Sequence, residues 1–364
     1  MKVLHVINGL PSGGAEKLIY DYSNHFSSSK CNIEVLILSS RNDVYSDRIL
    51  ANGIKVYKLS DGSVYNLLLF FSLIKFFISH RYDVLHVHLF PSFYFISILK
   101  AIGVIKCNLI FHEHNTKNGR IVSRWWRLLD KIIYKQYKYI VCISEAVKEA
   151  LVNAYQLDEK KLIVINNGID IKFCSKAIPI NRNVIDKSIS EDDVLLIMVA
   201  RFNPQKDHQT LLQVMALLPT KFKLILLGEG ETLEKTKKIA MDLGIIHRVF
   251  FLGYRSNPYS YIKASDIFIL SSVYEGFGLS CAEAMACGIP VIVSNVPGMT
   301  QVVGKAGLVF ETGDKFKLKN EILSITEDPI LKEKMVKEGG LQVEQFDIDV
   351  MIQKLLRLYK RTLA

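Results

Sequence analysis

Glu275 and Glu283 are the residues whose type and spacing most directly indicate chemistry. Seven residues separate them, and Gly276 and Gly278 let the backbone approach a ligand closely. A helix is predicted to begin near Leu279, where free N–H groups and the positive end of the helix dipole bind a diphosphate. One carboxylate can then bind a sugar and the other a ribose diol, because a carboxylate accepts from two hydroxyls at once. From spacing alone, an ordinary helix start with two surface glutamates stays open.

Arg201 and Lys206 form a second pair, directly after the predicted strand 194–200. Cleavage of a sugar–diphosphate bond leaves negative charge on the leaving oxygen, and fixed cations stabilise that charge. Arginine matches phosphate oxygens with a planar fork, whereas lysine supplies a compact charge on a mobile stem. A solvent-exposed basic pair is the alternative. No Asp-x-Asp follows a predicted strand, so the sequence predicts neither a metal ion nor another cofactor.

Histidines end two neighbouring predicted strands, as His86-Val-His88 and His112-Glu-His114. Residues two apart lie on one face of a strand, and paired imidazoles can ligate zinc. No third ligand stands at an obvious spacing, so no metal site is predicted. Two interpretations stay open: histidines hydrogen-bonded at strand ends, or an imidazole that contacts a ligand.

A run of basic residues indicates a surface for an anionic partner. Six of them recur at spacings of three or four, which predicts one stripe along a helix: Arg120, Arg124, Arg127, Lys131, Lys135 and Lys138. Trp125 lies beside this stripe, and a basic helix with tryptophans suits an anionic membrane. The alternative is a core-packing helix with a solvated charged side. No nucleic-acid motif accompanies the stripe, so no nucleic acid is predicted as a partner. The apolar block 64–78 is either a buried helix or part of the same docking face.

The elements that must position these residues alternate between apolar strands and helices. Strands are predicted at 3–7, 33–38, 84–88, 107–111 and 139–143, and then at 194–200, 222–227, 249–252, 267–270, 290–294 and 308–310. Apolar strands between helices indicate parallel sheets covered on both faces. The sequence therefore predicts an α/β protein with two doubly wound, Rossmann-like domains. Ligands of such sheets bind at the carboxyl ends of the strands, and a central cleft is expected where the two domains face each other.

Length and charge agree with this division. A chain of 364 residues exceeds what one core usually organises, and 49% apolar residues exclude a disordered or fibrous chain. Residues 1–150 carry a net charge of +8 out of +10. This asymmetry indicates an anionic partner for the first half.

Cysteine usage and hydropathy predict a cytoplasmic protein. The six cysteines are scattered without a CxxC pair, which fits a reducing compartment. The opening apolar run 3–7 is too short for a signal peptide and predicts a strand. The longest apolar stretch, 67–74, falls well short of the roughly 20 residues that a membrane-spanning helix needs.

The segment Glu275–Ile292 resembles the signature of the retaining glycosyltransferases of family 4, which have the two-domain GT-B fold. Its frame is Glu-Gly-Phe-Gly, then Glu-Ala-Met-Ala, then Gly-Ile-Pro-Val-Ile. Further segments are similar to the family over most of the chain: Gly13-Gly14-Ala15-Glu16, 167–170, Val199–His208, 227–230 and 251–254. One departure is Gln301, which stands where family members often carry an acidic residue, so no function is assigned to it.

The resemblance implies transfer of a hexosyl or N-acetylhexosaminyl group from a nucleotide-diphosphate sugar, with retention and without a metal. The acceptor would be a glycan or glycolipid, such as a lipid-linked or cell-surface polysaccharide precursor at the inner membrane face. Residues 1–170 would then be the acceptor-side domain and 171–345 the nucleotide-sugar-binding domain, with a helix at 346–364 packing back on the first.

The same resemblance assigns roles to individual residues. Glu283 would bind the ribose, Glu275 the sugar hydroxyls, and Arg201 with Lys206 the diphosphate. The backbone amides of Phe277, Gly278 and Leu279 would complete the cradle, and Gly13 and Gly14 would close over the phosphates. His114 matches the position of an imidazole near the donor sugar, with His88 a weaker second choice. The implied catalytic set is Glu275, His114, Arg201 and Lys206.

Three alternatives stay open at this point. A nucleotide-sugar epimerase shares the two-domain plan, and only product analysis without an acceptor separates it. A dinucleotide-dependent oxidoreductase also has Rossmann domains, but the loop 9–14 lacks GxGxxG spacing and no acidic residue ends the next strand. A non-catalytic membrane-binding module would not need Arg201, Lys206 and Glu283 together.

Overall fold

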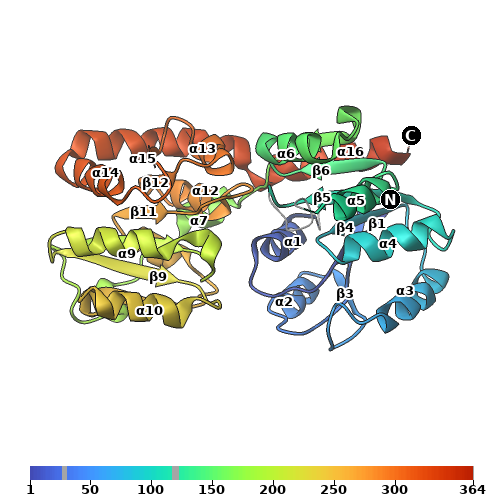
Figure 1. Cartoon of the computed structure of the whole chain (residues 1–364), viewed down its shortest axis with the longest axis horizontal. Coiled ribbons are helices and arrows are strands. Elements are labelled where there is room, and N and C mark those ends of the chain that lie inside the picture. Colours follow the sequence, from blue (N-terminus) through green and yellow to red (C-terminus); the bar gives the residue numbers. More distant parts are fainter. Residues whose placement is uncertain (27–30, 117–122, 364) are drawn as a thin grey trace. The chain divides into compact units, whose positions relative to one another are not determined.

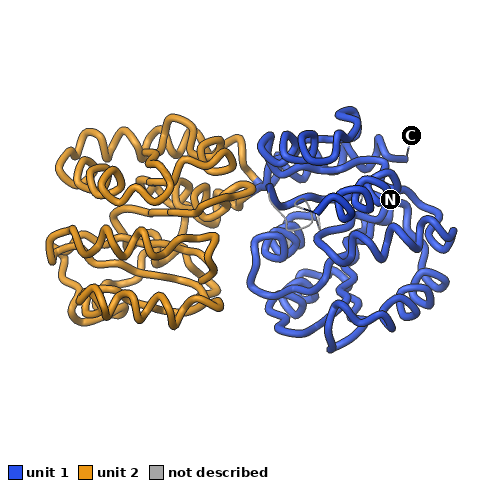
Figure 2. Tube along the Cα trace, viewed as in Figure 1, with its two compact units in different colours: residues 1–168, 348–364 blue, residues 169–347 orange. Residues whose placement is uncertain are grey.

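The computed structural model describes residues 1–26, 31–116 and 123–363 (Figure 1). The chain divides into two compact units (Figure 2). One comprises residues 1–168 together with 348–364, and the other comprises residues 169–347. The chain therefore leaves the first unit after Gly168 and returns to it at Ile348.

The first unit is built on a seven-stranded parallel sheet in the order β3-β2-β1-β4-β5-β6-β7. Its strands are β1 (Lys2–Ile7), β2 (Asn32–Ile37), β3 (Lys55–Lys58), β4 (Val84–His88), β5 (Asn108–Glu113), β6 (Tyr139–Cys142) and β7 (Leu162–Val164). All five residues of β4 are buried, as expected for a strand covered on both faces.

Helices cover both faces of this sheet. They are α1 (Gly14–His25), α2 (Ser46–Ala51), α3 (Leu68–Ser79), α4 (Ser92–Ala101), α5 (Arg124–Tyr134), α6 (Glu145–Tyr155) and the C-terminal α16 (Ile348–Leu363). The buried positions of α16 recur at helical spacing and join the core formed by α1 and the strands: Ile348, Met351, Ile352, Leu355, Leu358 and Tyr359. This apolar face makes α16 part of the first unit although it lies at the far end of the chain.

The second unit contains a six-stranded parallel sheet in the order β10-β9-β8-β11-β12-β13. Its strands are β8 (Val194–Val199), β9 (Phe222–Leu227), β10 (Val249–Gly253), β11 (Ile267–Leu270), β12 (Val291–Ser294) and β13 (Leu308–Phe310). Its helices are α7 (Ile171–Lys176), α8 (Arg182–Ile185), α9 (His208–Leu217), α10 (Leu233–Asp242), α11 (Tyr259–Ala264), α12 (Leu279–Ala286), α13 (Pro297–Val303), α14 (Lys315–Glu327) and α15 (Pro329–Val343).

Both sheets reverse their strand order at one point, between β1 and β4 in the first unit and between β8 and β11 in the second. Ligands of open parallel sheets bind outside the carboxyl ends of the strands at such a switch point. The loops that follow these four strands are therefore where a binding site is expected. The all-parallel sheets confirm the predicted fold class.

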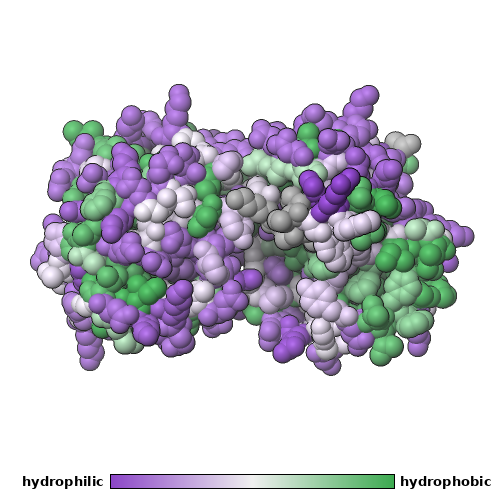
Figure 3. All heavy atoms as spheres, in the orientation of Figure 1, coloured by the Kyte–Doolittle hydropathy of each residue, from purple (hydrophilic) through white to green (hydrophobic). Residues whose placement is uncertain are grey.

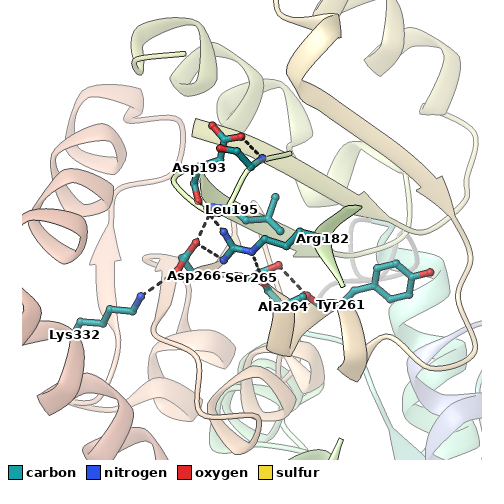
Figure 4. A network of polar contacts seen from close by, with 9 residues as sticks. Arg182, Asp193, Leu195, Tyr261, Ala264, Ser265, Asp266 and Lys332 are labelled. Carbon is teal, nitrogen blue, oxygen red and sulfur yellow. Dashed lines mark hydrogen bonds and ion pairs between the residues drawn. The ribbon is translucent and has the colours of Figure 1, made fainter. Parts of the chain in front are cut away.

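Asp266 lies at the amino-terminal ends of β8 and β11, away from the switch-point loops, and links the two strands there (Figure 4). One carboxylate oxygen accepts from the Leu195 amide at 2.9 Å and from Arg182 Nη2 at 2.9 Å. The other oxygen lies 3.2 Å from Lys332 Nζ. Arg182 also donates to the carbonyl oxygens of Ala264 and Asp193, at 3.1 and 2.8 Å. These contacts hold β8 and β11, the two strands at the switch point, next to each other.

Most predicted strands are present within two residues of their expected bounds, whereas two short strands were missed. β3 has four residues, exposed at both ends and half-buried in the middle, and β7 has only three residues, so neither gives a long apolar run. Among the described residues, no helix is both long and apolar enough to span a bilayer.

Candidate active site

The switch point of the second sheet brings Lys206 and Glu275 together. Lys206 ends a short 3₁₀ turn after β8, and Glu275 lies in the loop after β11. Lys206 Nζ forms an ion pair with Glu275 Oε2, and the two side chains are only 16% and 15% exposed. Ser272 Oγ donates to the same carboxylate oxygen at 3.4 Å. Two residues that the sequence assigned to donor binding are therefore direct partners.

Main-chain contacts hold the two loops against each other. The Val273 amide donates to the Gln205 carbonyl oxygen at 2.8 Å, and Gln205 Nε2 donates to the Tyr274 carbonyl oxygen at 2.8 Å. Ser271 Oγ lies 3.1 Å from the Lys206 carbonyl oxygen, to which it can donate. The backbone around Lys206 is thus fixed before any ligand binds.

Two glycines allow the backbone to approach this closely. A Cβ on Gly298, in α13, would lie 2.4 Å from the Glu275 carbonyl oxygen. Gly228, at the end of β9, has a φ of +143°, and a Cβ there would lie 2.0 Å from the Ala200 carbonyl oxygen. Any side chain at either position would displace the loop that carries Glu275 or the one that carries Arg201.

Helix α12 positions Glu283. The helix begins at Leu279, preceded by Gly278 at a φ of +90°, and Glu283 lies one turn inside it. Glu283 is 4% exposed, and Tyr259 Oη donates to its carboxylate at 3.0 Å. The aromatic ring of Phe277 packs in the core against Phe346, with ring centroids 5.2 Å apart, so its predicted contribution is its backbone amide. Tyr259 has no signal in the sequence, because only the fold brings α11 to α12.

The remaining predicted donor residues differ in their surroundings. Arg201 is exposed at the end of β8, in the same loop as Lys206. Gly13 and Gly14 form the N-terminus of α1 in the first unit, where the Gly13 carbonyl oxygen accepts from the Lys17 amide at 2.8 Å. Their contact with donor phosphates stays a prediction. Gln301 lies in α13, and its carbonyl oxygen accepts from Gln342 Nε2 at 3.4 Å.

Five histidines gather on one face of the first sheet, and the sequence analysis had paired only four of them. His5 on β1 lies in register with His86 on β4, and His88 lies in register with His112 on β5. His114 follows β5 and stacks on His112, with ring centroids 4.4 Å apart. The sequence could not show that His5 joins the paired histidines, because strand register cannot be seen in a sequence.

These rings form two groups of three whose ligand nitrogens lie within 4.8 Å of one another: His5, His86 and His88, and then His88, His112 and His114. The set of donors for a transition metal is therefore richer than the sequence indicated. Burial lowers the pKa of His5 and of His114 to about 3. Burial, followed by the neighbouring imidazoles, also places the pKa values of the other three well below the ordinary range. All five are neutral at pH 7.

A pocket of about 420 Å³ opens at the carboxyl ends of β1, β2 and β3. Its lining is mostly polar and includes Asn8, Glu16, Ser39, Arg41, Ser63 and Tyr65. Asn8 is fixed there by Ser92, whose Oγ donates to Asn8 Oδ1 at 2.7 Å. No motif marks this pocket in the sequence, because its residues come from three separate loops.

Exposed apolar side chains lie on both α5 and α3 in the first unit, and basic ones lie on α5. On α5, Trp125 is 79% exposed, and Arg124 and Arg127 are exposed beside it. On α3 and just before it, large apolar side chains are also exposed: Tyr65, Leu67, Leu68, Phe71 and Ile78. Figure 3 shows apolar side chains gathered where α3 and α4 lie in Figure 1.

The predicted basic stripe is only partly present on this surface. Helix α5 ends at Tyr134, so Lys138 lies outside it, and its Nζ donates to the Thr362 carbonyl oxygen at 2.8 Å. The stripe was predicted too long because spacing continues past the point where the chain leaves the helix. Lys131 lies in the last turn of α5, and Arg120 lies outside the described residues.

Two family profiles match nearly the whole chain. The one described as Glycosyltransferase Family 4 matches residues 12–173, and the one described as Glycosyl transferases group 1 matches residues 180–341. Together the two matches identify the chain as a family 4-like glycosyltransferase. The resemblance found in the sequence is confirmed, and this glycosyltransferase has the two Rossmann-like units of the GT-B fold.

Curated relatives of this glycosyltransferase are themselves named as sugar transferases. A UDP-Gal:alpha-D-GlcNAc-diphosphoundecaprenol alpha-1,3-galactosyltransferase of Escherichia coli is 26% identical over 306 residues, covering 79% of this chain and 78% of that protein. O-antigen chain mannosyltransferase B, also of Escherichia coli, is 33% identical over 172 residues, covering 45% of each chain. The epimerase and oxidoreductase alternatives gain no support from these relatives.

Solved structures agree on the fold of this glycosyltransferase. HepE of Anabaena, crystallised in complex with UDP and glucose, matches with a TM-score of 0.86 at 20% identity over 99% of each chain. WaaG, a glycosyltransferase involved in lipopolysaccharide biosynthesis, matches with a TM-score of 0.77 at 15% identity, covering 98% of this chain and 99% of that one.

Proposed function

We propose that this glycosyltransferase moves a hexosyl or N-acetylhexosaminyl group from a nucleoside diphosphate sugar to a hydroxyl of a lipid-linked glycan, with retention of anomeric configuration. The observation that carries the proposal is the Lys206–Glu275 ion pair at the switch point of the second sheet. A cation for phosphate and a carboxylate for sugar hydroxyls stand there side by side. The E. coli relative named for UDP-Gal and a diphosphoundecaprenol acceptor supports the same class of substrates.

Donor binding would redistribute the charge of this pair. Without donor, Glu275 neutralises Lys206. A diphosphate competes for the ammonium group, and the released carboxylate then accepts hydrogen bonds from the sugar. Glu283, held by Tyr259, binds the ribose diol at the start of α12, where backbone amides point at the phosphates.

Arg201 and Lys206 would stabilise the transition state. Negative charge builds on the leaving diphosphate as the glycosidic bond breaks, and fixed cations stabilise that charge more than the charge of the intact donor. Attack on the same face, assisted by the leaving phosphate, gives retention without a protein nucleophile. The two cations take the place of a divalent ion, so we propose that the transfer needs no metal.

The acceptor would bind to the first unit. The pocket beside Asn8 and Arg41 offers hydrogen-bond donors and a cation, which suit a glycan attached to a diphosphate. Tyr65 lines this pocket and also begins the exposed apolar side chains that continue into α3. A lipid-linked acceptor has the same sequence of properties, from polar head to apolar tail.

An anionic membrane surface would then be the place of the reaction, with the protein bound peripherally from the cytoplasmic side. Exposed tryptophan and leucine side chains of α5 insert among lipids, and Arg124, Arg127 and Lys131 contact anionic headgroups. The net charge of +10 favours the same contact.

A ligand screen followed by product analysis tests the proposal. Thermal unfolding is measured with UDP, GDP, ADP and their sugars, and the donor that raises the melting temperature is then supplied with an undecaprenyl diphosphate–linked acceptor. We expect one donor class to stabilise the fold and turnover to be unchanged in EDTA. The new glycosidic bond should have the same anomeric configuration as the bond to the diphosphate in the donor. Inversion of configuration, loss of turnover in EDTA, or stabilisation by no sugar nucleotide would each contradict the corresponding part.

A further inference from the structure

A chain of hydrogen bonds runs through the first unit from Tyr359 on α16 to His114 at the end of β5. Tyr359 Oη lies 3.3 Å from His5 Nε2. His5 Nδ1 lies 3.0 Å from His88 Nε2, and His88 Nδ1 lies 3.1 Å from His114 Nε2. Tyr359, His5 and His88 are at most 1% exposed, whereas His114 at the end of the chain is half-buried.

Because the rings are neutral, all hydrogen bonds of this chain must point in the same direction. Burial holds the pKa values of these imidazoles far below 7, so each ring is neutral and has one N–H donor and one acceptor nitrogen. A hydrogen bond between two such rings needs a donor on one side and an acceptor on the other. The tautomer of each ring therefore fixes the tautomer of the next.

The contacts of Tyr359 set the direction. Its Oη lies 2.6 Å from His86 Nδ1, a distance typical of an O–H donor, and 3.3 Å from His5 Nε2, which is long for one. These distances favour a hydroxyl that donates to His86 and accepts from His5. His5 Nδ1 then accepts from His88 Nε2, and His88 Nδ1 accepts from His114 Nε2. His114 is left with its proton on Nε2 and with Nδ1 as an acceptor.

We propose that Tyr359 is a positioning residue of the transferase, whose hydroxyl fixes through His5 and His88 the tautomer in which His114 offers Nδ1 as an acceptor to a substrate hydroxyl. The inference rests on the proposed function, in which His114 contacts substrate. It deepens that function, because a ring nitrogen without a proton accepts from a hydroxyl and cannot donate to a phosphate oxygen. His114 would then select a sugar or acceptor hydroxyl rather than the leaving group.

His112 has a different part in the cluster. Within the described part of the chain, neither of its ring nitrogens has a hydrogen-bond partner. Its ring stacks on His86 at 5.1 Å and on His114 at 4.4 Å between centroids. It therefore supports the rings of the chain by packing and does not transmit the tautomer.

The direct test is the tautomer of His114 in the full-length protein. Histidine is labelled with ¹⁵N, and the ring nitrogen shifts at pH 7.5 are assigned with the variant His114→Gln. We expect wild-type protein to hold His114 with its proton on Nε2, and Tyr359→Phe to populate both tautomers. Tyr137→Phe is the matched control, because Tyr137 is equally buried in the same unit but donates to the Phe93 carbonyl oxygen. An unchanged His114 spectrum in Tyr359→Phe, or a proton on Nδ1 in wild-type protein, overturns the proposal.

Kinetics separate this inference from the proposed function. If His114 contacts substrate, Tyr359→Phe lowers kcat about two- to five-fold with little change in donor KM, and Tyr137→Phe leaves both unchanged. A changed tautomer with unchanged kcat would keep the relay but remove the role of His114 in transfer. Zinc bound in stoichiometric amount to the purified protein would overturn the relay, because the metal would occupy the ring nitrogens that form it.

Discussion

Lys206 and Glu275 form an ion pair although 69 positions separate them in the chain. They meet because β8 and β11 are neighbours at the point where the strand order of the second sheet reverses. Each side chain is mostly withdrawn from water, so each carries a charge that the other compensates. The pair is therefore a structural contact and, in the proposed function, the charge that a donor diphosphate would displace.

The stability of the donor-free protein should depend on both partners together. Lys206→Met leaves a partly buried carboxylate without its cation, and Glu275→Gln leaves an ammonium group without its anion. Each single variant should lower the free energy of unfolding. We expect the loss in the double variant to be about 1 kcal/mol smaller than the sum of the two single losses. Urea unfolding of the four proteins measures this coupling, and additive losses would mean that the pair contributes nothing.

Transfer should depend on Lys206 and on Glu283. We expect Lys206→Ala and Glu283→Ala each to lower kcat/KM at least about ten-fold, or about 1.4 kcal/mol of transition-state stabilisation. Glu283→Ala should act mainly through donor affinity, because its predicted partner is the ribose. Glu234→Ala is the control, since that glutamate is exposed and pairs with Lys237 on the surface of α10. Wild-type rates in either of the first two variants would remove the residue from the donor site.

The sequence predicted the residues that follow strands better than the contacts between them. Glu275 and Lys206 could be named as candidates, and the start of α12 at Leu279 is confirmed, because loops after apolar strands have strong local signals. The support of Glu283 by Tyr259 and the entry of His5 into the histidine cluster were not found. Both depend on strand order and helix packing, which join positions far apart in the chain.

Helix α5 illustrates a second limit. Basic residues continue at helical spacing as far as Lys138, but the helix ends at Tyr134. The next segment must enter β6, and Lys138 instead bonds to the end of α16. Periodicity records which residues could share a helix face, whereas the boundary is set by the strand that follows.

The first unit should lose stability in mild acid. The pKa values of its five clustered histidines are lowered by burial, to about 3 for His5 and His114, whereas the unfolded chain has ordinary values near 6.5. The unfolded state therefore binds more protons below pH 6.5, and stability falls as pH decreases from there toward 3, by up to about 1.4 kcal/mol per pH unit for each histidine. Urea unfolding between pH 8 and pH 4.5 measures this slope.

Variants identify the histidines responsible. We expect His112→Leu to reduce the acid dependence, because it removes a buried imidazole without hydrogen bonds in the described structure. His247→Gln should leave the slope unchanged, since His247 is exposed. A free energy of unfolding that does not change between pH 6.5 and pH 4.5 would show that the cluster takes up no protons on unfolding.

Membrane binding should depend on the cations of α5. Each basic residue near an anionic surface contributes about 1 kcal/mol, so reversing Arg124, Arg127 and Lys131 to glutamate should weaken binding by at least about a hundred-fold. Co-sedimentation with vesicles that contain anionic lipid measures this affinity, and neutral vesicles test its charge dependence. Reversal of Lys221, Lys235 and Lys238 in the second unit changes net charge equally and should leave most binding intact. Equal losses in the two triple variants would mean that net charge, not α5, binds the membrane.

Gly298→Ala should impair transfer through the backbone rather than through any side chain of the site. The new methyl group would lie 2.4 Å from the Glu275 carbonyl oxygen and 2.8 Å from the Gly276 carbonyl carbon, so the loop that carries Glu275 must move. Catalysis is sensitive to displacements of about 1 Å, so we expect kcat/KM to fall at least about ten-fold. Gly340→Ala is the matched control, because α15 leaves open space at that position and alanine favours a helix by about 0.5–1 kcal/mol. That variant should therefore unfold at a higher temperature with unchanged activity, and an equally active Gly298→Ala would mean that the Glu275 loop tolerates displacement.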